Sequence, residues 1–468
     1  MANNSANWFK QVAQRAEGLG QQRLRVGVTG LSGAGKTTFI TSLINQLENH
    51  NKGLLARRAP FDRLESVRWQ RENVERAFPY LESLGALSAQ PARWPDSTSD
   101  LSRVVIDLRF RPQGLLRKLQ STRQLRLEII DYPGEWLLDL PLLQLDYGQW
   151  CEQMRQWLEA EPRRSLAGPL RDTLLGLDPA APVDAVQLVE LTEQWRQFLL
   201  RCRSEAGLSR NQPARFLQPG SDVAPQMLQF VPLLLANRHS AGEQGSWWAE
   251  CQARFNYYRD FVVRGFFEQH FRHLDQQVLL VDMLGPMDAG EAALNDLRDA
   301  MEAVLASFDY GRSGLLARLL RFRPRIGRLA FCATKVDKVN PAQQRAVQQC
   351  LEDLMVDRLA DVRHGGVEVR GLPLSAIRAT RQEGDALVAG LQGEEGWVRY
   401  RPGDIPAHLP QSLQVSSPDL LPLRPPPAQT HFQPQAQRPI RSVLFHLLLS
   451  LLPVLHSQEH TTYAMVPS

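Results

Sequence analysis

Cysteine is scarce in this chain of 468 residues, and its five cysteines are widely spaced: Cys151, Cys202, Cys251, Cys332 and Cys350. No two of them have the CxxC spacing of a zinc ribbon, and their pattern is not that of a disulfide framework. The N-terminus also lacks a basic segment followed by an apolar one, so the sequence predicts no secretory signal. We therefore expect a cytoplasmic protein.

Long hydrophobic runs are absent as well. The most apolar stretch, residues 440–455, is shorter than the roughly 20 residues that a membrane-spanning helix needs, and it contains Arg441, His446 and Pro453. It predicts no transmembrane segment but a helix that packs on the protein, with peripheral contact to the inner membrane as the alternative. The charge balance is only mildly basic, with 54 Lys and Arg against 50 Asp and Glu, and by itself it argues neither for nor against nucleic acid. We expect no nucleic-acid partner, because the basic stretch 312–328 lacks the repeated aromatic residues that would support base stacking.

The segment 26–38 carries the most specific motif of the chain. The phosphate-binding pattern GxxxxGK(S/T) is matched by Gly30, Gly35, Lys36 and Thr37, between the apolar run 24–29 and the helical pattern 37–47. Glycines let backbone N–H groups face phosphate oxygens, the lysine adds a positive charge, and the threonine hydroxyl binds Mg²⁺. The sequence predicts a nucleoside triphosphate site made of Ser32, Gly33, Ala34, Gly35, Lys36, Thr37 and Thr38. The alternative is a glycine-rich turn with a surface lysine.

A second motif, 131–136 (Asp-Tyr-Pro-Gly-Glu-Trp), directly follows the predicted strand 125–130. We expect Asp131 beside the Mg²⁺ ion and the Gly134 N–H at the γ-phosphate. Glu135 stands where many switch GTPases have the glutamine that orients the attacking water. Its carboxylate either orients or partly deprotonates this water, or points into solvent. With Lys36, the residues Gly134 and Glu135 are the candidates for catalysis.

The loop 94–100 lies between these two motifs and precedes the predicted strand 103–110. Thr98 in this loop is the candidate for the hydroxyl that completes the Mg²⁺ shell, with Ser97 and Ser99 as alternatives. Arg93 is the candidate for an arginine that stabilises charge in the transition state. Mg²⁺ is thus the predicted cofactor, held at Thr37, Thr98 and Asp131.

Two later segments indicate a guanine base. Thr334-Lys335-Val336-Asp337 follows the predicted strand 329–333 and is a variant of the guanine-recognition motif NKxD. Asp337 would accept two hydrogen bonds from guanine, and the methylene stem of Lys335 would lie on the base. One strand later, at Ser375, Ala376 and Ile377, a backbone amide would face the guanine O6. The alternative for the first segment is an ordinary helix cap.

A second DxxG pattern is present at 282–285. The strand that carries Asp131 already lies between the phosphate loop and this segment. We therefore predict a structural or loop-positioning role for Asp282.

Strand patterns alternate with helical ones over most of the chain, with strands expected at 24–29, 103–110, 125–130, 277–284, 328–334 and 369–374. This predicts an α/β fold, a P-loop NTPase three-layer sandwich with a mainly parallel sheet. The stretch 137–273 is predicted as an inserted all-α domain between two parts of the nucleotide-binding domain, 1–136 and 274–403. A Pro/Gln-rich segment and a C-terminal helix, 404–468, follow.

Two charged stretches have less specific interpretations. Residues 62–84 alternate Arg with Glu and predict a helix with a solvated face. The stretch 312–328 is basic and amphipathic, and it indicates either a solvated face or a surface for an acidic protein or anionic lipid.

With these motifs together, the chain resembles the YcjX family of bacterial P-loop NTPases from about residue 23 to residue 403. The resemblance rests on 30–37, on Trp94-Pro95-Asp96-Ser97-Thr98, on 131–136, on Val281-Asp282 and on 334–337. It implies a Ras-like GTPase core with a helical domain, a link to stress response and association with an inner-membrane protein of the YcjF type.

These observations predict a regulatory GTPase that binds GTP and GDP and hydrolyses GTP slowly with Mg²⁺. Two alternatives remain open. One is an ATPase or small-molecule kinase, in which the segment 334–337 is coincidence. The other is a nucleotide-locked scaffold with negligible turnover.

Overall fold

The computed structural model describes residues 21–51, 61–70, 74, 76–96, 100–111, 123–217, 219–220, 223–235, 243–306, 326–393 and 396–426. Three of the sequence predictions fall outside these residues: Thr98 with its neighbours 97 and 99, most of the basic stretch 312–328, and the apolar stretch 440–455.

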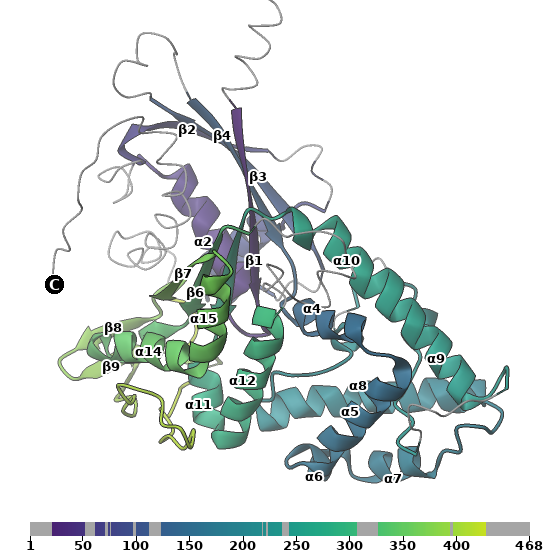
Figure 1. Ribbon diagram of the computed structural model, residues 1–468. Coiled ribbons are helices and arrows are strands. Elements are labelled where there is room, and N and C mark those ends of the chain that lie inside the picture. The colour runs from purple at the N-terminus through teal and green to yellow at the C-terminus, as the bar shows by residue number, and fades with distance from the viewer. Residues whose placement is uncertain are drawn as a thin grey trace, which may run out of the picture.

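A seven-stranded sheet lies at the centre of the protein (Figure 1), in the order β2-β3-β4-β1-β5-β6-β7. β1 pairs in parallel with β4 and β5, and β5, β6 and β7 continue in parallel, whereas β3 is antiparallel to both its neighbours. The predicted α/β fold with a mainly parallel sheet is confirmed. The strands are β1 (Gln21–Gly30), β2 (Leu64–Gln70), β3 (Ser102–Phe110), β4 (Arg123–Asp131), β5 (Gln276–Val281), β6 (Arg328–Ala333) and β7 (Glu368–Pro373).

Helices cover both faces of this sheet because its strands present apolar side chains on both sides. On one face, helix α2 (Lys36–Glu48) buries Phe39, Ile40 and Leu43 against residues of β1, β3 and β4. On the other face, α12 (Glu291–Ala306), α14 (Gln344–Leu354) and α15 (Val356–His364) pack against β5 and β6. Two hydrophobic cores thus lie on opposite sides of the sheet.

The described chain between β4 and β5 is helical and gathers at the lower right of Figure 1. Its buried residues, among them Trp150, Trp195 and Phe255, belong to the same core cluster as Leu279 of β5 and Phe331 of β6. This region therefore shares its core with one face of the sheet, and its description as an inserted domain stays a prediction. Its helices are α4 (Glu135–Leu138), α5 (Tyr147–Glu159), α6 (Arg163–Ala167), α7 (Pro169–Gly176), α8 (Ala185–Ala206), α9 (Trp247–Tyr257) and α10 (Arg264–Gln269).

The helix predicted over 62–84 is wrong in its first half. Residues Leu64–Gln70 form β2, the edge strand that pairs with β3, and a helix, α3 (Tyr80–Ser88), begins only at Tyr80. An edge strand exposes many of its charged side chains, so its Arg and Glu residues resemble the polar face of a helix. Pairing with β3, which the local pattern does not show, decides the conformation.

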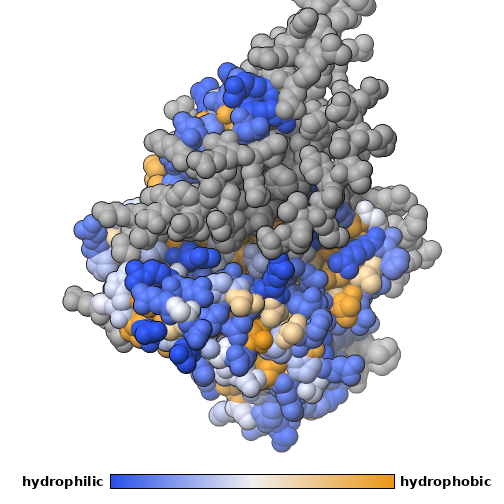
Figure 2. Space-filling model, turned by 90° about the vertical axis from the view of Figure 1, so that its left-hand side faces the viewer, coloured by the Kyte–Doolittle hydropathy of each residue, from blue (hydrophilic) through white to orange (hydrophobic). Residues whose placement is uncertain are grey.

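After β7 the described chain forms a small antiparallel sheet of β8 (Thr380–Glu383), β9 (Ala386–Ala389) and β10 (Val398–Tyr400). Residues 401–424 follow in irregular conformation, apart from a bridge between Leu391 and Leu423. Figure 2 shows this side of the molecule, where the coloured surface is mostly hydrophilic with small separate hydrophobic areas. Within the described ranges, no helix is both long and apolar enough to cross a membrane. The remaining helix, α11 (Leu284–Ala289), follows β5.

Candidate nucleotide-binding site

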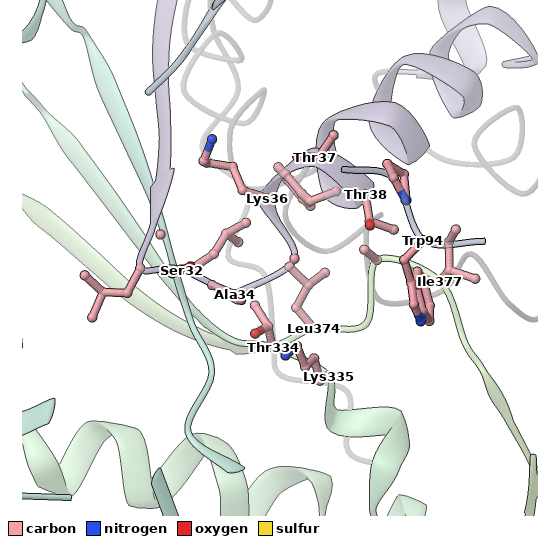
Figure 3. Close-up of a pocket in the computed structure, with 18 of the residues that line it drawn as sticks. Ser32, Ala34, Lys36, Thr37, Thr38, Trp94, Thr334, Lys335, Leu374 and Ile377 are labelled. Atoms are coloured by element: carbon pink, nitrogen blue, oxygen red, sulfur yellow. The ribbon is translucent and has the colours of Figure 1, made fainter. Parts of the chain in front are cut away.

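A cavity of about 320 Å³ opens where β1, β6 and β7 end. Ligands bind in α/β sheets at these carboxyl ends. In Figure 3, Ser32 and Lys36 lie on one side of this pocket, Trp94 and Ile377 lie on the other, and Thr334, Lys335 and Leu374 lie below the phosphate loop. The cavity wall includes most of the predicted nucleotide-binding residues: Ser32, Gly33, Ala34, Gly35, Lys36, Thr37, Thr38, Thr334, Lys335, Asp337, Ala376 and Ile377.

The phosphate loop turns between β1 and the first turn of α2. The Ala34 N–H donates to the Leu31 carbonyl at 3.0 Å, and Gly33 and Gly35 have φ angles of 81° and 82°. Residues other than glycine rarely adopt this left-handed conformation. The turn therefore needs both glycines, and it places the loop at the N-terminus of α2, where backbone N–H groups attract anions.

Gly134 lies directly against the start of this loop. Its N–H donates to the Gly30 carbonyl oxygen at 3.3 Å, and a Cβ on Gly134 would lie 2.6 Å from that same oxygen. Only glycine fits such an approach. The segment after β4 thus reaches the phosphate loop, and its Pro133 and Glu135 line the cavity.

Lys36 and Asp131 form a buried ion pair at the end of β4. Ser102, which begins β3 opposite Asp131, donates its hydroxyl to the second carboxylate oxygen at 3.1 Å. No local sequence signal marks Ser102, because its contact with Asp131 depends on the β3–β4 register. In such sites Mg²⁺ takes oxygen donors from one or two side chains together with phosphate oxygens. Thr37 lines the cavity and its hydroxyl fits this ion, whereas Asp131 is fully buried behind the cavity wall, in contact with Lys36 and Ser102.

Glu135 is buried and lies against the phosphate loop instead of pointing into solvent. Its Oε1 accepts a hydrogen bond from the Ser32 N–H at 2.8 Å and lies 3.3 Å from Nη2 of Arg203, in the last turn of α8. Arg203 was not among the predicted site residues, because its place near the loop depends on how α8 packs. Arg93, in contrast, is exposed, and its neighbours Trp94 and Pro95 line the cavity while Arg93 does not.

Asp337 is held rigidly in the pocket wall. It is 5% exposed, and its Oδ2 accepts the Ala379 N–H at 2.8 Å. Its own N–H donates to the Ser375 Oγ at 2.9 Å, and the Thr380 hydroxyl donates to its carbonyl at 2.6 Å. Ser375 therefore orients the backbone that carries Asp337, and the two predicted base-binding segments are directly connected.

Lys335 bridges the predicted base-binding segment and the DxxG pattern at 282–285. Its Nζ lies 2.6 Å from Oδ2 of Asp282, and a Cβ on Gly33 would lie 4.0 Å from the same nitrogen. Burial alone would raise the pKa of Asp282, but the Lys335 ammonium and the Gly285 N–H hold it below its usual value. These contacts support the predicted positioning role of Asp282, because it holds Lys335 beside the phosphate loop.

The outer wall of the cavity comes from residues 420–424, which we call the C-terminal strap. The Trp94 Nε1–H donates to the Leu423 carbonyl at 2.7 Å, and the Lys338 Nζ donates to the Leu421 carbonyl at 3.2 Å. Burial and the nearby Lys335 lower the pKa of Lys338. Pro422 and Leu423 line the cavity with Trp94. The composition of this stretch predicts a separate Pro/Gln-rich segment, because nothing in it indicates a contact with Trp94.

A family model matches most of this chain. Residues 24–451 match the model described as the YcjX-like family, DUF463. The chain belongs to the YcjX-like family. This membership confirms the resemblance drawn from the motifs.

Two curated relatives in the family are similar to this chain over most of its length. The Ras-like GTPase YcjX of Escherichia coli (strain K12) is 36% identical over 414 residues, which cover 83% of this chain and 87% of the relative. The Ras-like GTPase YcjX of Shewanella oneidensis (strain MR-1) is 35% identical over 433 residues, which cover 86% of this chain and 88% of the relative.

Proposed function

We propose that this protein binds GTP and GDP and hydrolyses GTP with Mg²⁺ as a regulatory switch. The observation that carries the proposal is the position of Asp337, a buried carboxylate in the wall of the cavity that the phosphate loop also lines. A fixed carboxylate accepts hydrogen bonds from the N–H and amino groups of guanine, which adenine does not present in the same arrangement. The names of the two relatives, both Ras-like GTPases, support the same function.

The phosphate end of the site accounts for binding of a triphosphate. Lys36 forms an ion pair with Asp131. When phosphates enter, they compete for the lysine ammonium, and Asp131 becomes available to the cation. Mg²⁺, held by Thr37 and through Asp131, would neutralise charge on the β- and γ-phosphates.

The segment after β4 supplies the groups next to the γ-phosphate. The Gly134 N–H donates to the Gly30 carbonyl, so the predicted bond to the γ-phosphate would require it to change partner. The Glu135 carboxylate accepts the Ser32 N–H. A fixed carboxylate beside the γ-phosphate can accept a proton from the attacking water or orient it. We assign Glu135 this role, and the stress-response role and the inner-membrane partner stay predictions.

Calorimetric titration of nucleotide-stripped protein with GDP and ADP in the presence of Mg²⁺ tests the proposal. We expect GDP to bind at least about 100-fold more tightly, a difference of about 2.7 kcal/mol. Asp337→Asn should transfer the preference to xanthosine diphosphate, whose base presents the complementary groups. Asp357→Asn, an exposed carboxylate on α15, is the matched control. Equal affinities for GDP and ADP would refute guanine recognition and favour an ATPase or kinase.

A further inference from the structure

Arg203 reaches the phosphate end of the site from a distant helix. It lies in the last turn of α8, which ends at Gly207 in a left-handed conformation, φ 64°. Its guanidinium Nη2 is 3.3 Å from Glu135 Oε1, the same oxygen that accepts the Ser32 N–H. Glu135 is 3% exposed and Arg203 is 24% exposed at their side chains, so the pair is largely shielded from water. Because water is largely excluded, the electrostatic interaction between the two side chains is stronger than it would be at the surface.

The end of α8 is fastened to the nucleotide-binding core. Asp296 of α12 accepts the Arg210 N–H at 2.7 Å and also the Ser209 N–H, and it pairs with Arg163. These contacts follow α8 directly in the chain and join it to α12. The C-terminal end of α8, which carries Arg203, is therefore held against α12 by contacts other than the one with Glu135.

The segment that carries Glu135 is fastened to the same stretch of chain. The Gln212 side chain donates to the Leu138 carbonyl, and Asp139 accepts the Ala214 N–H at 2.9 Å. Helix α4, which begins at Glu135, thus has its C-terminal end fixed to residues 212–214. Both partners of the Arg203–Glu135 pair are positioned by the loop after α8, so their approach is built into the fold.

The negative charge of Glu135 affects the binding of a nucleoside triphosphate. A nucleoside triphosphate brings its γ-phosphate to the loop whose Ser32 N–H holds Glu135, so two negative groups come close together. Like charges at short distance in a shielded site oppose each other unless a cation compensates them. Lys36, and Mg²⁺ when it is bound, would compensate the charges of the phosphates and of Asp131. Arg203 is the cation that contacts Glu135.

We propose that Arg203 is a positioning residue that compensates the charge of Glu135 and holds it against the phosphate loop, so that the site accepts a triphosphate as well as a diphosphate. The proposal rests on the proposed function, since it concerns the third phosphate at that same site. It connects α8, outside the nucleotide-binding motifs, to the group that faces the γ-phosphate. A diphosphate lacks this phosphate and should bind without the help of Arg203.

The test compares affinities for GDP and for a non-hydrolysable GTP analogue, both with Mg²⁺, in five forms of the full chain. These are the unmodified protein, Arg203→Met, Arg203→Lys, the double variant Arg203→Met with Glu135→Gln, and the control Arg201→Met. Methionine keeps much of the length of arginine and removes its charge. Arg201 lies on the same helix, is exposed and pairs with Glu205. Thermal unfolding of each form shows whether its fold is retained.

We expect Arg203→Met to weaken binding of the GTP analogue about tenfold or more relative to GDP, a ratio that a purely structural role would not change. Arg203→Lys should keep most of the affinity, because it keeps the charge. The double variant should restore the ratio, because the glutamine removes the repulsion. Arg201→Met should leave both affinities unchanged.

Two results would overturn the proposal: an equal loss of both affinities in Arg203→Met, or a loss that persists in the double variant. Either result would mean that Arg203 has only a structural role. A failure of the proposed function is recognised separately. If the unmodified protein binds adenine and guanine nucleotides equally, guanine recognition is refuted. The role of Arg203 can then still be tested by comparing the affinities for ADP and for a non-hydrolysable ATP analogue.

Discussion

Asp139, directly after α4, permits a quantitative prediction about stability and pH. It is 1% exposed, and it accepts the Ala214 N–H at 2.9 Å and the hydroxyl of Tyr258. Burial raises its pKa to about 7, although the hydrogen bonds from Tyr258 and Ala214 act in the opposite direction. The folded protein therefore holds the proton of this carboxyl far above the pH at which the unfolded chain releases it.

The sign of the effect follows from this difference. The unfolded carboxyl ionises near its ordinary pKa of 3.8, whereas the folded one ionises at about 7. Between these values the folded state binds more protons than the unfolded state, so the free energy of unfolding falls as the pH rises. The contribution of Asp139 to stability is fully present below the pKa of the unfolded chain, 3.8. It is lost as the pH rises through the pKa of the folded protein, about 7. A separation of about three pH units corresponds to about 4 kcal/mol in all.

The perturbation is Asp139→Asn, which keeps the shape and the acceptor for Ala214 but does not titrate. Urea unfolding at pH 5 and pH 8 measures the loss of stability over this interval. Between pH 5 and pH 8 the free energy of unfolding of the unmodified protein should fall by about 3 kcal/mol more than that of Asp139→Asn. The reason is that about two of the pH units that separate the two pKa values lie between pH 5 and pH 7. Asp172→Asn, whose parent side chain is 78% exposed, is the control and should behave like the unmodified protein. Equal losses in Asp139→Asn and the unmodified protein would refute the assignment.

Two further predictions concern the nucleotide site. Glu135→Gln keeps an acceptor for the Ser32 N–H but removes the carboxylate, so single-turnover GTP hydrolysis should slow by at least about tenfold while GDP affinity is kept. An unchanged rate would favour the nucleotide-locked scaffold. Trp94→Phe removes the hydrogen bond to the Leu423 carbonyl and should speed GDP dissociation about fivefold, as a chase of fluorescent GDP would measure, since one such bond contributes about 1 kcal/mol. Trp397→Phe, 53% exposed in the parent, is the control, and equal rates in both variants would contradict a role for the strap.

Strands β5 and β6 could be predicted because they are mostly apolar and are buried on both faces over nearly their whole length. β5 has six buried residues in succession, and its pattern shows this without any tertiary information. β2 was misread because an edge strand exposes its charged side chains. The small sheet β8–β10 escaped prediction because strands of three or four residues are too short for a periodic pattern.

The site was predictable where its residues are close in sequence. The phosphate loop and the segment 131–135 combine specific residue types with a strand that ends beside them, so the motif itself predicts the geometry. Arg203 and Ser102 lacked such a signal. Arg203 approaches Glu135 from 68 positions away, and Ser102 meets Asp131 through strand register. Arg93, chosen for its place in the chain, is exposed because it belongs to the turn after α3.

By itself, the sequence determined the parallel α/β core, the phosphate loop with Lys36, and the segments that carry Asp131 and Asp337, because local patterns of burial and turn chemistry specify them. The tertiary structure alone decided that Arg203 meets Glu135 and that Trp94 meets Leu423, 329 positions away. Such contacts depend on how whole helices and irregular segments pack, and packing depends on side chains spread over the entire chain. A short sequence motif does not specify contacts with residues so far away in the chain.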